Sequence, residues 1–322
     1  CENNVNNASA QGIPYVDKYD LTVSPFLSAE AAYGRIIDDL KTAEGIMLKN
    51  GEYFDNADQQ NNEFLKDRQI HMNLYAVQGM LARVYWMKGD LKTAAGYAQK
   101  VLDCGYFELS DKSEIEDLVN GVLSPKETIW GLFSANFYTN VRANLYLTGN
   151  ASCLFLKSDH DDTYLADKEG TDYRYEKWFK NYSAIEASGM RCIKVLDTYE
   201  LNYATRSDAR VKGVNMLRLP ELYYIITEYY LSIDNQTEAV KYFDKVLVSR
   251  GLTGYADRQG ATLTLEKVIQ ERRKELVCEG QYFFTQKRYN QNIYEPKSGK
   301  IYQASNDIYV LPLPENETEY RY

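Results

Sequence analysis

The amino-acid sequence predicts a mostly α protein in which helical hairpins form a scaffold and carry a loop-rich, aromatic-rich insertion. Apolar residues recur at helical spacing in two regions, at about 28–108 and about 220–280. Between them, from about 110 to 218, the helical periodicity fades and aromatic residues become frequent. The length of 322 residues suffices for a large core. We therefore expect residues 1–322 to form a single domain.

The clearest pattern lies in residues 71–107. Two runs of apolar residues at i, i+3, i+4 spacing each predict one buried helix face. Gly89 suits the left-handed position that ends the first helix, and Asp90 can cap the second. Small alanines in the second run allow the helices to approach closely. This arrangement is typical of a tetratricopeptide-like hairpin, a unit that builds binding surfaces.

Breakers and caps define the elements before this hairpin. Residues 1–27 are expected to be irregular, because Pro14 and Pro25 interrupt regular structure. Ser28 is a good N-cap for the helix that follows it. Residues 49–69 are expected to form a polar loop.

A second hairpin is predicted over residues 220–252. Pro220 fits the first turn of its first helix, and Thr237 can cap its second helix. A further helix is expected from about 263 to 279, with Gly280 as its stop. The C-terminal tail is predicted to be extended, because its prolines exclude a helix.

Composition excludes several classes of partner. The formal net charge of −9 argues against nucleic acid, since no basic stripe is present to neutralise phosphates. It also argues against electrostatic binding to anionic lipid. No apolar run is long enough to cross a bilayer, and no signal peptide is present, so we expect either a mature exported form or a cytosolic protein.

The five cysteines are odd in number and contain no CxxC spacing, so neither a zinc site nor a disulfide framework is indicated. Most of them are expected to be small core residues. Cys1 differs because it is the first residue. It is either the lipidated cysteine of a mature lipoprotein or simply the point where the given sequence begins.

Signatures of catalysis are missing from the sequence. His71 and His160 are the two histidines, and neither lies in a metal-binding or triad-like motif. The acidic run 159–162 consists of residue types that ligate metals but lacks EF-hand spacing, so we interpret it as a solvated loop. We predict no enzymatic activity, no cofactor and no bound metal.

The charged run 271–279 invites a different interpretation. Residues three and four apart share a helix face, so Glu271 with Lys274, and Arg272 with Glu275, are expected to be neighbours. Glu221 and Arg288 are further partners. We predict an internal ion-pair network that locks helices together.

The inserted segment is the best candidate for a ligand site, because loops on rigid scaffolds concentrate binding residues. Flat aromatic rings suit both sugar faces and peptide backbones, and the chain holds 29 tyrosines. Packing between helices is the other role open to each ring, above all to Trp130, which lies in the strand-like run TIWGLF. The candidate ligand-binding residues are Trp130, Tyr138, Tyr146, Tyr164, Tyr175 and Trp178.

Six segments, in order along the chain, resemble motifs of the SusD/RagB family of outer-membrane nutrient-binding lipoproteins. They are GIPYV at 12–16, YGRIIDDLKTA at 33–43, LARVY at 81–85 with the following Gly89 and Asp90, RLPEL at 218–222, ERRKELVCEGQYFFTQKR at 271–288 and YVLPLPE at 309–315. Two departures stand out. Thr285 replaces the family's usual Asp, and the helices that precede the first motif in the family are expected to be absent here, either from the given sequence or because this is a short member.

The resemblance implies one SusD-like domain on the cell surface, attached to the outer membrane through a lipid anchor. It further implies capture of a nutrient oligomer, glycan or peptide, and delivery to a SusC-type TonB-dependent transporter. Glu2 supports lipidation at Cys1, since surface-exported lipoproteins of this group favour acidic residues just after the cysteine. The alternatives are a tetratricopeptide-like adaptor for protein partners and, from the enzyme class, a glycosidase.

Overall fold

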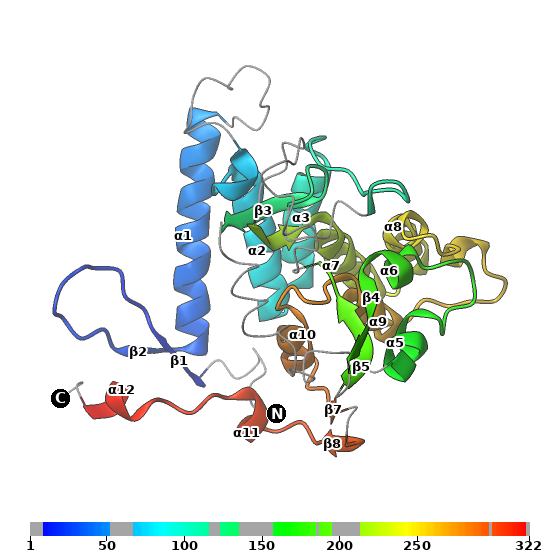
Figure 1. Ribbon diagram of the computed structural model, residues 1–322. Coiled ribbons are helices and arrows are strands. Elements are labelled where there is room, and N and C mark those ends of the chain that lie inside the picture. The colour runs from blue at the N-terminus through cyan, green and yellow to red at the C-terminus, as the bar shows by residue number, and fades with distance from the viewer. Residues whose placement is uncertain are drawn as a thin grey trace, which may run out of the picture.

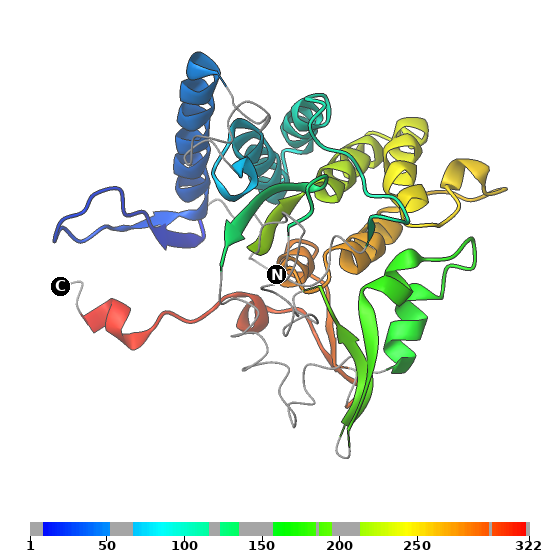
Figure 2. The same cartoon turned by 45° about the horizontal axis from the view of Figure 1, so that its top comes forward.

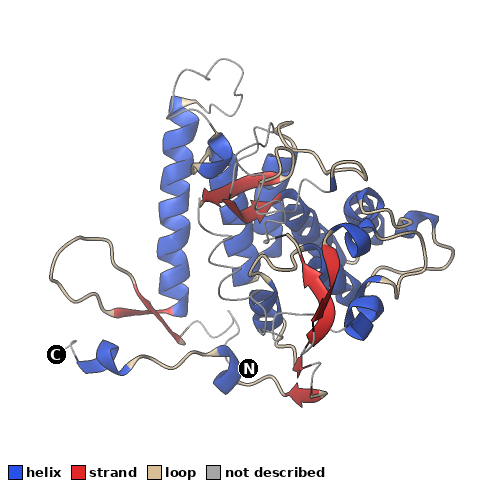
Figure 3. Ribbon diagram, in the orientation of Figure 1, coloured by secondary structure: helices blue, strands red, loops and turns tan. Residues whose placement is uncertain are grey.

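The computed structural model describes residues 9–51, 67–115, 123–134, 157–184, 187–194, 213–295 and 298–319. Helices dominate these residues and the strands are short (Figure 3). The prediction of a mostly α protein is therefore confirmed. Tyr138, Tyr146, Cys1 and Cys153 lie outside the described residues.

The first helices begin where the caps predict. Ser28 accepts a hydrogen bond from the amide of Ala31 and starts helix α1 (Ala29–Asn50). Helix α2 (Leu74–Lys88) is capped by Asn73, after the short 3₁₀ helix η1 (Arg68–Ile70). Gly89 is left-handed, with φ +91°, and Asp90 caps helix α3 (Leu91–Leu102) by accepting from Thr93. The predicted hairpin is confirmed.

The second hairpin consists of α7 (Leu219–Ser232) and α8 (Gln236–Ser249). Pro220 lies in the first turn, as predicted. The predicted cap Thr237 is wrong: Asn235 caps α8 by accepting from the amide of Glu238. Asparagine competes well for this role, and the helix starts one residue before the threonine. After the short 3₁₀ helix η6 (Tyr255–Asp257), α9 spans Leu265–Glu275 and ends before Gly280, and α10 (Tyr282–Arg288) follows without having been predicted.

The helices α1, α2, α3, α7 and α8 lie side by side in one curved row (Figures 1 and 2). Helix α3 packs directly on α7, and the hydroxyl of Tyr242 on α8 donates to Gln99 on α3 at 2.8 Å. The two hairpins therefore form one continuous scaffold although a long segment separates them in sequence. One apolar cluster joins α1, α2, α3 and α7 around Trp86.

The inserted segment contains more regular structure than the sequence predicts. Strand β3 (Thr128–Phe133) pairs antiparallel with β6 (Gly213–Arg218) beside α2, and β4 (Phe179–Ala184) pairs with β5 (Ala187–Cys192). Helices α5 (Lys157–Tyr164) and α6 (Tyr173–Lys177) precede the second pair. The acidic run 159–162 lies on α5 and is not a loop. The side chains of His160 and Tyr164, one helical turn apart, are buried against the antiparallel pair β4–β5 and hold this polar helix in place.

Both ends of the described chain lie at one side of the molecule (Figure 1). Strand β1 (Gln11–Pro14) pairs with β2 (Phe26–Ser28), and the loop between them projects beside α1. The C-terminal part contains β7 (Ile293–Glu295), β8 (Lys300–Tyr302), α11 (Asn306–Tyr309) and α12 (Glu315–Glu319). The tail is thus extended only between short elements. Among the described residues, no helix combines the length and apolarity needed to cross a bilayer.

Candidate functional site

The structure gives two of the predicted ligand-binding residues a packing role. Trp178 is fully buried, donates to the carbonyl of Ile115 at 3.1 Å and has the Lys194 ammonium 4.1 Å above its ring. Tyr164 is buried and donates to the carbonyl of Lys274 at 3.0 Å. Neither ring presents an open face, because each lies inside the apolar cluster formed by α5, α6, β4 and β5.

Trp130 and Tyr175 keep part of their surface accessible. Trp130 lies on β3, as the strand-like run TIWGLF predicts, and is half-buried against the main apolar core. The Tyr175 hydroxyl donates to Asp161 at 2.9 Å and accepts from Lys157 at 3.0 Å. These two residues stay candidates for ligand contact, together with Tyr138 and Tyr146.

A cluster of buried charges, here called the ionic core, joins the inserted segment to the helical scaffold. Among the described residues it contains equal numbers of cationic and anionic side chains, each at most 7% exposed. Its members are Arg174, Lys194, Arg218, Arg250, Lys274, Glu127, Asp172, Glu271, Glu275 and Glu279. Buried charges persist only when paired in this way.

Glu275 lies at the centre of the ionic core. Its carboxylate accepts from Arg218 at 2.8 Å, from Arg250 at 2.9 Å and from Arg174 at 3.3 Å. Burial alone would raise the pKa of Glu275, but Arg250, Arg218 and Arg174 outweigh it and hold the pKa well below its usual range. The predicted internal ion-pair network is therefore confirmed.

Some of the predicted pairings are correct and others are wrong. Lys274 donates to Glu271 at 2.7 Å, as the helical spacing predicts. Arg272 pairs with Glu221, at 2.7 Å, and not with Glu275, because the Glu275 carboxylate points into the ionic core and binds Arg218 and Arg250 there. Arg83 from α2 binds the second oxygen of Glu221 at 2.6 Å, so this carboxylate connects α2, α7 and α9.

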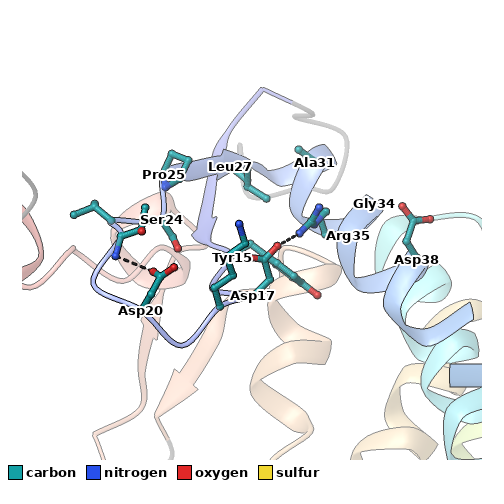
Figure 4. A pocket seen from close by; sticks show the side chains of 13 residues that line it. Tyr15, Asp17, Asp20, Ser24, Pro25, Leu27, Ala31, Gly34, Arg35 and Asp38 are labelled. Carbon is teal, nitrogen blue, oxygen red and sulfur yellow. Dashed lines mark hydrogen bonds and ion pairs between the residues drawn. The ribbon is translucent and has the colours of Figure 1, made fainter. Parts of the chain in front are cut away.

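Among the described residues, a hollow lies between the β1–β2 loop and α1 (Figure 4). Its volume of about 500 Å³ falls in the range of small-molecule sites, roughly 300–1,000 Å³. The lining combines an aromatic ring, carboxylates, hydroxyls, cations and apolar side chains. It consists of Tyr15, Asp17, Lys18, Asp20, Thr22, Val23, Ser24, Pro25, Leu27, Ala31, Gly34, Arg35 and Asp38.

Contacts across this hollow hold the loop against α1. The Arg35 guanidinium forms an ion pair with Asp17 and lies 5.3 Å from the centre of the Tyr15 ring (Figure 4). The hydrogen bond that Tyr15 donates to Asp39 raises the pKa of its phenol. Asp20 accepts from the amide of Thr22 at 2.8 Å and shapes the loop.

This arrangement suits a ligand with many hydroxyl groups. Carboxylates accept hydrogen bonds from hydroxyls, guanidinium donates to them, and an aromatic ring packs on apolar C–H faces. Within the described residues, no group of three or more His, Cys, Asp or Glu is placed to hold a metal ion. The sequence did not predict this hollow, because the two family-like motifs that contain Tyr15 and Arg35 indicated the fold and not a ligand site. The polar residues at every few positions between 15 and 24 were the available signal.

Comparisons with known proteins identify a family and several solved structures that this chain resembles. The family model described as "SusD family" matches residues 133–321. A SusD-like carbohydrate binding protein from Bacteroides vulgatus superposes with a TM-score of 0.69 at 16% identity, and the match covers 98% of this chain and 70% of that one. A SusD superfamily protein from Bacteroides thetaiotaomicron gives 0.72 at 18% identity, with the same coverage.

The surface glycan-binding protein A from Bacteroides uniformis is also similar, with a TM-score of 0.64 and 15% identity over 94% of this chain and 70% of that one. At these identities the structural likeness shows the fold alone. Curated proteins gave no significant sequence match. The family model covers more than half of the chain, and its match includes the last three of the six ordered motifs. The chain belongs to the SusD family.

Proposed function

We propose that this protein is a non-enzymatic cell-surface protein that binds nutrient oligomers, glycans most readily, and delivers them to a SusC-type TonB-dependent transporter of the outer membrane. The observation that carries the proposal is membership of the SusD family. Two structural relatives are described as carbohydrate binding and glycan-binding, which favours a glycan over a peptide ligand. Attachment to the membrane through a lipid on Cys1 is part of the proposal.

Two places support ligand binding. The hollow between the β1–β2 loop and α1 combines Tyr15, Arg35 and carboxylates within reach of one ligand. The inserted segment carries the partly accessible rings of Trp130 and Tyr175. We place the first sugar contact in the hollow, because there polar and aromatic groups face the same space.

A binding screen with matched variants tests the proposal. The purified chain is titrated with oligosaccharide and peptide panels by calorimetry. For the glycan that binds, Tyr15→Ala and Arg35→Ala should each weaken affinity at least about tenfold, the effect of losing one well-placed contact. Tyr294→Ala is the control, since Tyr294 is exposed on β7 away from the hollow.

Each outcome has a distinct meaning. If Trp130→Ala and Tyr175→Ala lose binding while Tyr15→Ala keeps it, the ligand site lies in the inserted segment and not in the hollow. Binding of peptides alone would establish the alternative ligand class. Binding of neither would refute capture of a nutrient oligomer.

Partnership and anchoring need separate measurements on the native protein. Purification from outer membranes in mild detergent should recover a TonB-dependent transporter together with this chain. Mass spectrometry of the native N-terminus should find a lipid on the cysteine. Repeated recovery without the transporter, or an unlipidated cytosolic chain, would instead favour a soluble adaptor.

A further inference from the structure

Two cysteines meet where the β4–β5 ribbon contacts the end of α9. Cys192 is the last residue of β5 and is buried, whereas Cys278 follows α9 and is half-buried. Burial and the neighbouring Cys278 thiol raise the pKa of the Cys192 thiol. Both pack in the apolar cluster that contains Trp178. No sequence pattern indicates this pair, because the two residues are far apart along the chain.

Neighbouring contacts fix the approach of the two thiols. The Lys194 ammonium, two residues after Cys192, donates to the carbonyl of Glu275 at 2.9 Å and pairs with Glu279. The Tyr164 hydroxyl binds the carbonyl of Lys274 from the same side of the ribbon. The two contacts of Lys194 therefore hold the segment that bears Cys192 against the segment that bears Cys278, and the Tyr164 contact holds α5 against the same end of α9.

The backbone at Cys278 adds a second observation. Its φ of +61° is left-handed, a conformation that glycine adopts freely and other residues adopt at a cost. Gly280, two residues on, provides the other left-handed residue of this turn. The turn at Cys278 packs its side chain against the apolar cluster that contains Cys192, so the strained conformation coincides with this packing.

We propose that Cys192 and Cys278 form an intramolecular disulfide that ties the β4–β5 ribbon to the end of α9. Disulfides persist in exported proteins, where the surroundings are oxidising. The inference goes beyond ligand binding and does not depend on which ligand is bound. Cys104 lies against a different apolar cluster and serves as a control.

The reaction is a two-step thiol–disulfide exchange with a small disulfide such as oxidised glutathione. Cys278 is the more accessible thiol. It loses its proton and attacks the oxidant, which releases one glutathione thiol and leaves a mixed disulfide. Cys192 loses its proton, attacks the Cys278 sulfur and releases the second glutathione thiol. The two protein thiols are oxidised by two electrons, and one oxidised glutathione is reduced to two thiols.

Refolding in a glutathione redox buffer tests the proposal without requiring the oxidant to enter the native core. The full chain is unfolded and reduced, refolded, quenched with acid, alkylated and digested with trypsin. Cleavage after Arg191, Lys194, Lys274 and Lys287 releases the peptides 192–194 and 275–287. We expect them to appear as one linked species that reduction separates.

Stability supplies an independent measurement. The oxidised chain should melt on the order of 5 °C above the reduced chain, because the link constrains the unfolded state. Cys278→Ser and Cys192→Ala should each abolish both the linked peptide and this difference. Cys104→Ser should keep both.

The proposal would be overturned by a link between any other pair of the five cysteines, or by Cys192 and Cys278 remaining fully alkylated after refolding at strongly oxidising ratios. A linked species without any change in melting temperature would also contradict it, since the proposed role is to tie two elements together.

Discussion

Glu221 shows how a single residue connects three helices. Burial alone would raise its pKa, but Arg83 and Arg272 lower the pKa from 4.5 to about 2. A carboxylate with a lowered folded-state pKa stabilises the fold above its unfolded pKa, and this contribution is lost as the pH falls from about 4.5 towards 2. The shift corresponds to about 3 kcal/mol of the free energy of unfolding.

Glu221→Gln should therefore lower the free energy of unfolding by about 3–5 kcal/mol at pH 7, because it leaves Arg83 and Arg272 short of a counter-charge. Urea unfolding at several pH values measures this, and the gap to wild type should narrow below pH 4. Glu30→Gln is the control: its partner Lys88 and Glu30 itself are partly exposed, and the loss should stay below about 1 kcal/mol.

His160 is a buried titratable residue of the opposite kind. It lies among Tyr164, Tyr175 and Phe179, and its Nδ1 is 3.6 Å from Asp161, beyond hydrogen-bonding distance. Burial lowers the pKa of His160. The unfolded state therefore takes up a proton first, and the fold loses stability as the pH falls below about 6.5.

His160→Gln should flatten this loss between pH 6.5 and 5, and its melting temperature should vary less with pH than that of wild type. A series of thermal melts by circular dichroism checks the prediction. Identical slopes for the two proteins would mean that His160 does not titrate differently on unfolding.

At the scale of elements, the close approach of two backbones joins the inserted segment to α8. The Gly251 carbonyl, just after α8, accepts from the Thr171 amide at 3.0 Å. Gly251 has φ +86°, and a Cβ there would lie 2.3 Å from the Thr171 carbonyl oxygen. Only glycine meets both conditions.

Gly251→Ala should accordingly destabilise the protein by about 3 kcal/mol, through left-handed strain and the backbone clash. Gly96→Ala offers a matched substitution with the opposite sign. Gly96 lies exposed inside α3 with open space around its Cα, so alanine should stabilise the helix by about 1 kcal/mol. Chemical denaturation of both variants measures the difference, and equal effects would contradict the argument.

The helices of the two hairpins could be predicted from the sequence, whereas α5, α6, α10 and the strands could not. Each helix of the two hairpins carries its own periodicity and a local start signal, such as the cap Asp90 of α3 or Pro220 in the first turn of α7. Strand β3 pairs with β6 across a long stretch of sequence, and no local pattern specifies such a partner. The 159–162 run was misread for the same reason, since distant packing and not local polarity decides that it is helical.

At the scale of the whole molecule, the scaffold and the inserted segment are joined by a shared core. The ionic core takes residues from β6, α6, the end of α8 and α9, so neither part completes it alone. We expect one cooperative unfolding transition. Trp86 reports the scaffold and Trp178 reports the inserted segment, because they lie in separate apolar clusters.

Variants that keep a single tryptophan, Trp86 or Trp178, should show coincident thermal transitions by fluorescence. Far-UV circular dichroism should melt at the same temperature. An earlier transition at Trp178 would show that the inserted segment unfolds independently of the hairpins.

The candidate site was predicted less well than the scaffold. An aromatic ring signals either packing or recognition, and only its surroundings decide between them. Trp178 and Tyr164 are packing residues, whereas Tyr15 and Arg35, which no sequence pattern marked as site residues, line the hollow beside α1. Prediction therefore succeeded for helices, whose signals are local in sequence. It failed for aromatic rings, whose role depends on neighbours that are distant in sequence.

The ionic core also has a consequence for how the chain reaches its native state. Its charges balance within the described residues, so a complete cluster buries no net charge, while any partial assembly does. We expect a segment that arrives late to leave uncompensated arginines or glutamates, which keep water in the partly assembled cluster. The cluster acts as a checkpoint, because the chain becomes compact at this point only when every contributing segment has arrived.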